Sequence, residues 1–234
     1  MKAVIFDMNG VIIRDERFHQ QSWRELCAVN PDTFKPPSEE EFKHNVFGRT
    51  EQATLEYLLG RPITQDELDY YSDIRVGIVK NLFGPHLALT EGLKELLEHL
   101  KEENVPLGIA TSSRTNYVSF ILDRLGIRGF FSTVATAENI PVGRGKPHPD
   151  IYEKTARELG VSPTSCIVFE DTVSGIKAGR DAGAIVIAVA TTHEAAELTR
   201  FAHKVVPDFQ GLTLDFLHRV HLEAEGKRGY LERR

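Results

Sequence analysis

Four separated segments of the chain carry polar side chains whose combination suits the transfer of a phosphoryl group. They hold Asp7 and Asn9, then Thr111, then Lys146, and finally Asp171. A carboxylate can attack phosphorus, and carboxylate oxygens are the ligands that Mg²⁺ prefers. A lysine neutralises phosphate charge, while a hydroxyl and backbone N–H groups at the start of a helix can bind phosphate oxygens. These residue types predict a magnesium-dependent site with Asp7 at its centre.

The apolar runs that accompany these segments indicate buried strands of a parallel sheet. They span residues 2–6, 105–110, 131–136, 166–169 and 185–189. Runs that are apolar at nearly every position are typical of strands covered by helices on both faces. Helical patterns separate the later runs, at residues 93–100, 115–125, 151–159 and 175–182. The alternation predicts an α/β fold with a doubly wound parallel sheet, a Rossmann-like core, in which ligands bind at the carboxyl ends of the strands.

Almost a hundred residues separate the first strand from the second, and most of them predict helices alone. The helical patterns lie at residues 15–29, 39–46, 51–59 and 66–82. A structureless loop of that length inside a compact domain is implausible. We therefore predict a helical cap domain at residues 14–83, a catalytic core at 1–13 and 84–222, and a frayed or loosely docked tail at 223–234.

Each polar group also has an ordinary structural explanation. An Asp after a strand is often a turn residue, and Thr111-Ser112-Ser113 before a helix is typical of an N-cap. A lone Lys is commonly a solvated surface residue, and Glu170-Asp171 before a helix suits the helix dipole. These polar groups nevertheless occur together, each at or beyond the end of a predicted strand. This combination favours a functional site. A P-loop is excluded, because Ile140 stands where that motif needs Gly and Pro147 where it needs Ser or Thr.

Composition narrows the classes of protein that the chain can represent. The net charge is -6 without a basic block before the last few residues, which disfavours nucleic acid as a partner. No run approaches the roughly 20 apolar residues of a membrane span. Cys27 and Cys166 form no CxxC pair, so neither a zinc site nor a redox pair is indicated. Disulfide use is disfavoured, which fits a reducing compartment. We expect a cytoplasmic monomer or weak dimer that acts on a small phosphorylated metabolite.

Taken together, the motifs resemble the four signature motifs of the haloacid dehalogenase-like superfamily. They are Asp7-Met8-Asn9-Gly10-Val11, Thr111-Ser112-Ser113, Gly145-Lys146-Pro147 with Pro149-Asp150, and Glu170-Asp171 with Ser174-Gly175-Ile176 and Ala182-Gly183. Within the superfamily the chain is most similar to the beta-phosphoglucomutase and phosphoglycolate-phosphatase-like branch. The resemblance covers about residues 2–190, and its motifs are specific for the superfamily but not for a substrate.

The resemblance implies roles for residues of the core. Asp7 would be the nucleophile and a Mg²⁺ ligand, and Asn9 would offer its backbone carbonyl to the metal. Thr111 and Lys146 would bind the transferring phosphoryl group. Asp171 would be a further Mg²⁺ ligand. Three further polar residues of these motifs are assigned to substrate binding: Ser112, Ser113 and Glu170.

The resemblance also points to two residues of the predicted cap. Arg49, in the segment Phe47-Gly48-Arg49-Thr50, would hold a distal phosphate or carboxylate of the substrate. His19 and Trp23 match a His and a Trp that the branch often has near the hinge. His19 would contact the substrate or the site, or would be a hydrogen-bonded hinge residue, and the sequence leaves both open.

Asn9 departs from the family pattern, because phosphatases and mutases of the family usually have Asp there. That Asp protonates the leaving group and then takes a proton from water, whereas an amide cannot carry a proton back and forth. General acid–base catalysis contributes about 10²–10⁴ in rate. Arg14 is a second departure, at a hinge position that often carries Asp.

Several explanations of Asn9 remain open at this stage. Another group, such as His19 or the substrate itself, would carry the proton, or the leaving group would need no acid. Alternatively, the chain would be a phosphate-binding regulatory or sensor protein with little turnover, or Asn9 would be an engineered substitution. Carbon–halogen or carbon–phosphorus cleavage is disfavoured, because nothing in the cap clearly supplies a Schiff-base lysine or a halide cradle. The leading hypothesis is a phosphatase or phosphomutase that acts through an aspartyl phosphate.

Overall fold

The computed structural model divides the chain into two compact units. It describes residues 1–34, 37–41, 46 and 51–231. The core unit comprises Met1–Arg14 and Ala88–Arg234, and the helical unit comprises Asp15–Leu87. The helical unit is thus a single insertion that follows the first strand of the core. The assignment of these units as a catalytic core and a cap stays a prediction.

A six-stranded, all-parallel sheet forms the centre of the core unit. Its strands, in the order β3-β2-β1-β4-β5-β6, are β1 (Ala3–Phe6), β2 (Leu107–Ala110), β3 (Thr133–Ala135), β4 (Cys166–Glu170), β5 (Ile185–Val189) and β6 (Lys204–Val206). Every residue of β1, β2, β4 and β5 is buried. This burial explains why these runs are apolar throughout, and it confirms the predicted doubly wound parallel sheet.

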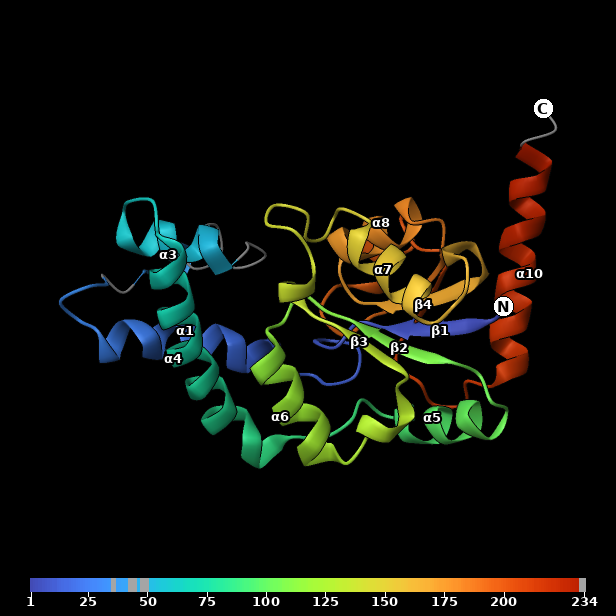
Figure 1. The fold of residues 1–234 in the computed structure, drawn as a ribbon, viewed down its shortest axis with the longest axis horizontal. Helices are drawn as coiled ribbons and strands as arrows, with labels where there is room; N and C mark the ends of the chain where they lie inside the picture. Colours follow the sequence, from blue (N-terminus) through green and yellow to red (C-terminus); the bar gives the residue numbers. More distant parts are fainter. Residues whose placement is uncertain (35–36, 42–45, 47–50, 232–234) are drawn as a thin grey trace. The chain divides into compact units, whose positions relative to one another are not determined.

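Helices cover both faces of the sheet, with α7 and α8 on one face and α5 and α6 on the other (Figure 1). Their bounds are α5 (Leu93–Glu102), α6 (Thr115–Leu125), α7 (Asp150–Glu158) and α8 (Val173–Asp181). The leucines of α5 are buried at helical spacing, as the sequence predicts: Leu93, Leu96, Leu97 and Leu100. Short 3-10 helices connect other parts of the core, at Arg128–Phe130, Ala137–Asn139 and Pro163–Ser165.

The C-terminal part of the core contains elements that the sequence patterns did not predict: β6, α9 (Ala195–Leu198) and α10 (Leu214–Leu231). Residues 223–231 of the predicted tail form the second half of α10, and Ala224 among them is buried. Its Glu, Ala, Lys and Arg residues favour helix despite two glycines. His221 and Glu225 also lie one turn apart on α10, with 3.5 Å between Nδ1 and a carboxylate oxygen.

The helical unit has a hydrophobic core of its own, which includes Trp23, Leu26 and Leu55. Its helices are α1 (Glu16–Val29), α2 (Glu39–Glu41), α3 (Glu51–Leu59) and α4 (Gln65–Phe83), followed by a 3-10 turn at Gly84–His86. The start of α4 is fixed by a capping box between Thr64 and Glu67. Of the predicted helix at 39–46, residues 42–45 lie outside the described residues. No helix among the described residues is long and apolar enough to cross a membrane.

Candidate functional site

The register of the sheet brings the predicted polar residues to one edge. Phe6 pairs with Ile109 on β2 and with Phe169 on β4, so the residues that follow these positions lie side by side. Asp7 directly follows β1, and its N–H donates to the carbonyl of Phe169 at 3.0 Å. Thr111 directly follows β2, and both residues are buried. The parallel strands therefore place groups from distant parts of the sequence in contact.

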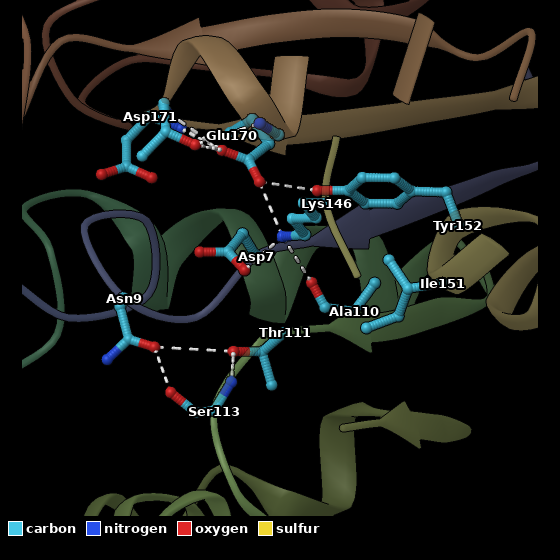
Figure 2. A network of polar contacts seen from close by, with 12 residues as sticks. Asp7, Asn9, Ala110, Thr111, Ser113, Lys146, Ile151, Tyr152, Glu170 and Asp171 are labelled. Carbon is cyan, nitrogen blue, oxygen red and sulfur yellow. Dashed lines mark hydrogen bonds and ion pairs between the residues drawn. The ribbon is translucent and has the colours of Figure 1, made fainter. Parts of the chain in front are cut away.

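Lys146 binds two carboxylates at the centre of this edge. Its Nζ donates to Asp7 Oδ1 at 2.6 Å, to Glu170 Oε1 at 2.6 Å and to the carbonyl of Ala110 at 3.1 Å. Figure 2 shows these side chains pointing toward one another. Burial alone lowers the pKa of Lys146, but the charges of Asp7 and Glu170 outweigh it and raise the pKa above its ordinary value. The ammonium group is thus held in its charged form beside the predicted nucleophile.

Both carboxylate oxygens of Glu170 accept hydrogen bonds. Oε1 also accepts from the Tyr152 hydroxyl at 2.8 Å, and Oε2 accepts from the backbone N–H groups of Asp171 and Thr172 at 2.9 and 3.0 Å. Burial raises its pKa, but Lys146 and these donors lower it to below its ordinary value. A Cβ on Gly175 would lie 1.7 Å from Oε1, so the approach of α8 requires glycine. These contacts favour a role for Glu170 in positioning Lys146. They disfavour direct contact between Glu170 and the substrate.

Asp7, Glu170 and Asp171 offer carboxylate oxygens that all lie within 4.8 Å of one another. Asp171 Oδ2 accepts a hydrogen bond from the Thr192 hydroxyl. Its Oδ1 is buried and has no hydrogen-bond partner within the described part of the chain. Unpaired buried carboxylate oxygens are costly, and they are suitable ligands for a hard divalent cation.

The electrostatics of this cluster also fit a divalent cation. Burial raises the pKa of Asp7 to about 7, although Lys146 acts in the opposite direction. Burial, together with the charges of Glu170 and Asp7, raises the pKa of Asp171 well above its ordinary value. One lysine thus faces three carboxylates, which leaves negative charge in excess. The oxygens of Asp7 and Asp171, with the backbone carbonyl of Asn9, are the group that could hold Mg²⁺.

Asn9 links the loop after β1 to the loop after β2. Its Oδ1 accepts from the Ser113 hydroxyl at 2.6 Å and from the Thr111 hydroxyl at 3.5 Å. The N–H of Ser113 in turn donates to Thr111 Oγ1 at 3.1 Å. The structure therefore brings Asn9, Thr111 and Ser113 together, whereas Ser112 is exposed. Their roles in catalysis or substrate binding stay predictions.

His19 is engaged on both ring nitrogens inside the helical unit. Its Nε2 lies 2.9 Å from Asp15 Oδ2, and its Nδ1 lies 3.0 Å from Arg75 Nη1. Because a guanidinium only donates, Nδ1 must accept and Nε2 must carry the proton that Asp15 accepts. Arg75 also donates to Glu51 at 2.6 Å and stacks over the Trp23 ring. These contacts favour the hinge-residue interpretation of His19 over a role as a proton carrier.

One predicted site residue lies outside the described part of the chain, and some residues that contact the site were not predicted from the sequence. Arg49 lies outside the described residues. Tyr152 was missed because nothing local in a helix indicates a partner on a distant strand. Thr192 was also missed, although its place shortly after the fifth strand was a usable signal. Gly10 was given no structural role, yet it has φ of +74° and a Cβ there would lie 1.9 Å from Asp171 Oδ2.

Comparisons with known proteins agree on one family. A model of the haloacid dehalogenase-like hydrolases matches residues 1–183. A beta-phosphoglucomutase of Bacillus subtilis is 30% identical over 226 residues, which cover 93% of this chain and 94% of that protein. Validoxylamine A 7'-phosphate phosphatase of Streptomyces hygroscopicus subsp. limoneus is 29% identical over 208 residues, covering 84% and 89%.

A solved structure extends the similarity to the fold. It is a HAD hydrolase of family IA, variant 3, from Entamoeba histolytica, and the TM-score is 0.85 at 32% identity. The match covers 94% of this chain and 99% of that one. The family match itself spans all four polar segments of the site, from Asp7 to Asp171.

Proposed function

The chain is an enzyme of the haloacid dehalogenase-like hydrolase family, and we propose that it transfers the phosphoryl group of a small phosphorylated metabolite through an aspartyl phosphate on Asp7, with Mg²⁺ bound. The family match confirms the resemblance that the sequence motifs carry. The similar phosphatase and phosphoglucomutase support a phosphatase or phosphomutase activity. The single observation that carries the proposal is the buried contact between Asp7, Lys146 and the acidic cluster.

The proposed chemistry assigns a distinct task to each of these residues. One oxygen of Asp7 attacks phosphorus, and the bond from phosphorus to the leaving-group oxygen breaks. Lys146 neutralises phosphate charge beside Asp7, since its Nζ lies 2.6 Å from that carboxylate. Asp7, Asp171 and the backbone carbonyl of Asn9 would hold Mg²⁺, which masks negative charge on the transferring group. Water, or a hydroxyl of an acceptor molecule, then takes the phosphoryl group from Asp7.

The test is phosphate release, or phosphoryl transfer to an acceptor, from a panel of phosphorylated metabolites with Mg²⁺. Asp7→Asn should lower the rate to the uncatalysed background, because an amide cannot serve as this nucleophile. The matched control is Asp123→Asn, which changes an exposed carboxylate that pairs with Arg128 on the surface. It should keep full activity. Turnover by Asp7→Asn equal to that of the unmodified enzyme would contradict the proposal.

Asn9 is the feature that favoured a regulatory protein with little turnover as the alternative. The named activities of the relatives favour an enzyme instead. The two functions are separated by measuring binding and turnover on the same ligands. Saturable binding of phosphorylated ligands without Asp7-dependent release from any of them would support the regulatory alternative.

A further inference from the structure

We propose that Thr192 is a positioning residue for Asp171: its hydroxyl holds Oδ2 of that carboxylate, so that Asp171 binds the cation through Oδ1 alone. The inference rests on the proposed Mg²⁺ site and deepens it, because it names a residue that controls how one ligand is presented. It is carried by a contact between the ends of β4 and β5, and by the backbone that packs against this contact.

The two carboxylate oxygens of Asp171 have different surroundings. Oδ2 accepts a hydrogen bond from the Thr192 hydroxyl. Oδ1 is buried and has no hydrogen-bond partner within the described part of the core. Metal-binding carboxylates are commonly oriented by hydrogen bonds from neighbouring residues. This asymmetry makes Oδ1 the oxygen that Asp171 presents to a cation.

The loop after β1 packs against the same hydrogen bond. Gly10 in this loop has φ of +74°, and a Cβ there would lie 1.9 Å from Asp171 Oδ2 and 2.8 Å from Thr192 Oγ1. Such a close approach of the backbone requires glycine. The hydroxyl and the loop together limit the space around Oδ2.

Further hydrogen bonds fix the short segment that carries Thr192. The N–H of Ala190 donates to the carbonyl of Val206 on β6 at 2.8 Å. The hydroxyl of the next residue, Thr191, donates to the carbonyl of Gly10. The segment is therefore bound both to the sheet and to the loop after β1, which gives the Thr192 hydroxyl a defined position beside the carboxylate.

Presentation of one oxygen suits Mg²⁺ better than Ca²⁺. Mg²⁺ requires nearly octahedral ligands at about 2.0–2.1 Å, whereas Ca²⁺ takes about six to eight oxygens at about 2.3–2.6 Å and accepts both oxygens of one carboxylate. Without the Thr192 hydroxyl, the Asp171 carboxylate can rotate and offer both oxygens. Loss of the hydroxyl should therefore weaken the binding of Mg²⁺ more than that of Ca²⁺. A hydrogen bond that serves only to stabilise the fold would not affect the two cations differently.

The experiment measures Kd for Mg²⁺ and for Ca²⁺ separately, by calorimetric titration of the metal-depleted protein without substrate. Thr192→Val replaces the hydroxyl by a methyl group of similar size. We expect Kd for Mg²⁺ to rise about 10–100-fold and the preference for Mg²⁺ over Ca²⁺ to fall by about tenfold. Thr192→Ser keeps the hydroxyl and should retain the preference of the unmodified protein.

Thr199→Val is the matched control, because the Thr199 hydroxyl is exposed and donates to the carbonyl of Ala195 on α9. It should leave Kd for both cations unchanged. Equal weakening of Mg²⁺ and Ca²⁺ in Thr192→Val would assign Thr192 a purely structural role and overturn the inference. Unchanged binding of both cations in that variant would overturn it as well.

A second measurement needs no variant, so it stands even if Thr192→Val fails to fold. In a crystal structure of the unmodified protein with Mg²⁺, Asp171 should bind the cation through Oδ1 while Oδ2 keeps its hydrogen bond to Thr192. Binding through Oδ2 or through both oxygens, or a cation that does not contact Asp171, would overturn the inference. Neither result would affect the proposed function, which is refuted instead by the absence of Asp7-dependent turnover on every phosphorylated compound.

Discussion

The core unit and the helical unit each bury a network of polar side chains, but the charges in the two networks are balanced differently. In the helical unit, Arg75 and His19 lie between Asp15 and Glu51, so donors and acceptors alternate. In the core unit, Lys146 faces Asp7, Glu170 and the nearby Asp171. The first network sets one guanidinium and one imidazole against two carboxylates. The second carries excess negative charge, which a bound cation would balance.

The largest effect that tests this comparison is expected from Lys146→Met. Removing the ammonium group leaves Asp7 and Glu170 buried without their cationic partner, which should lower the free energy of unfolding by about 3–5 kcal/mol and abolish turnover. Denaturant unfolding measures the loss. Lys154→Met is the matched control, because the Lys154–Glu158 pair is partly exposed and should be worth less than about 1 kcal/mol. Equal losses for the two variants would contradict a special role for Lys146.

Magnesium should stabilise the core site in a way that depends on Asp171. A ligand that binds only the folded state adds about 2.7 kcal/mol at a concentration of 100 times Kd. Thermal unfolding with and without Mg²⁺ should show this increase in the unmodified protein and lose it in Asp171→Asn. Without Mg²⁺ the variant should be no less stable, because it removes a buried charge that lacks a full set of partners. An undiminished response to Mg²⁺ in Asp171→Asn would rule this residue out as a ligand.

Arg75→Met tests the polar network in the helical unit. It leaves Glu51 and His19 without their shared donor, so we expect a loss of about 1–3 kcal/mol in the free energy of unfolding. The stabilisation by Mg²⁺ should be retained, because that site belongs to the other unit. Lys80→Met, elsewhere on α4, provides a control for the loss of a positive charge. Loss of the Mg²⁺ response in Arg75→Met would show that the two networks are not independent.

The smallest effect is expected from an exposed pair in the helical unit. Hydrogen bonds from Arg61 and from the backbone of Thr64 lower the pKa of Glu67 from 4.5 to about 2. Because the folded-state pKa is depressed, the contribution of Glu67 is present above pH 4.5 and is lost as the pH falls toward 2. Glu67→Gln should therefore differ from the unmodified protein at pH 6 and approach it at pH 2.5. A difference in stability that does not change with pH would contradict this account.

The sequence by itself indicated five of the six strands and the polar residues that follow them. Asp7 and Thr111 directly follow buried apolar runs, and Glu170-Asp171 closes a third. Since parallel strands present their carboxyl ends at one edge, this local pattern was sufficient to predict that the residues converge. The helix from Thr115 to Leu125 was also predicted at its observed bounds, because an apolar stripe and a following glycine are local signals.

Only the tertiary structure decided which of these residues bind one another and which elements complete the sheet. Lys146 and Asp7 are 139 residues apart, and no periodicity in the sequence indicates that pair or the Tyr152 contact to Glu170. The strand β6 has three residues at an edge of the sheet, too few for an alternating pattern. Likewise, His19 was recognised from its motif, but its partner Arg75 comes from another helix. Local patterns report propensity and burial, whereas the pairing of distant side chains depends on how the packed elements align in space.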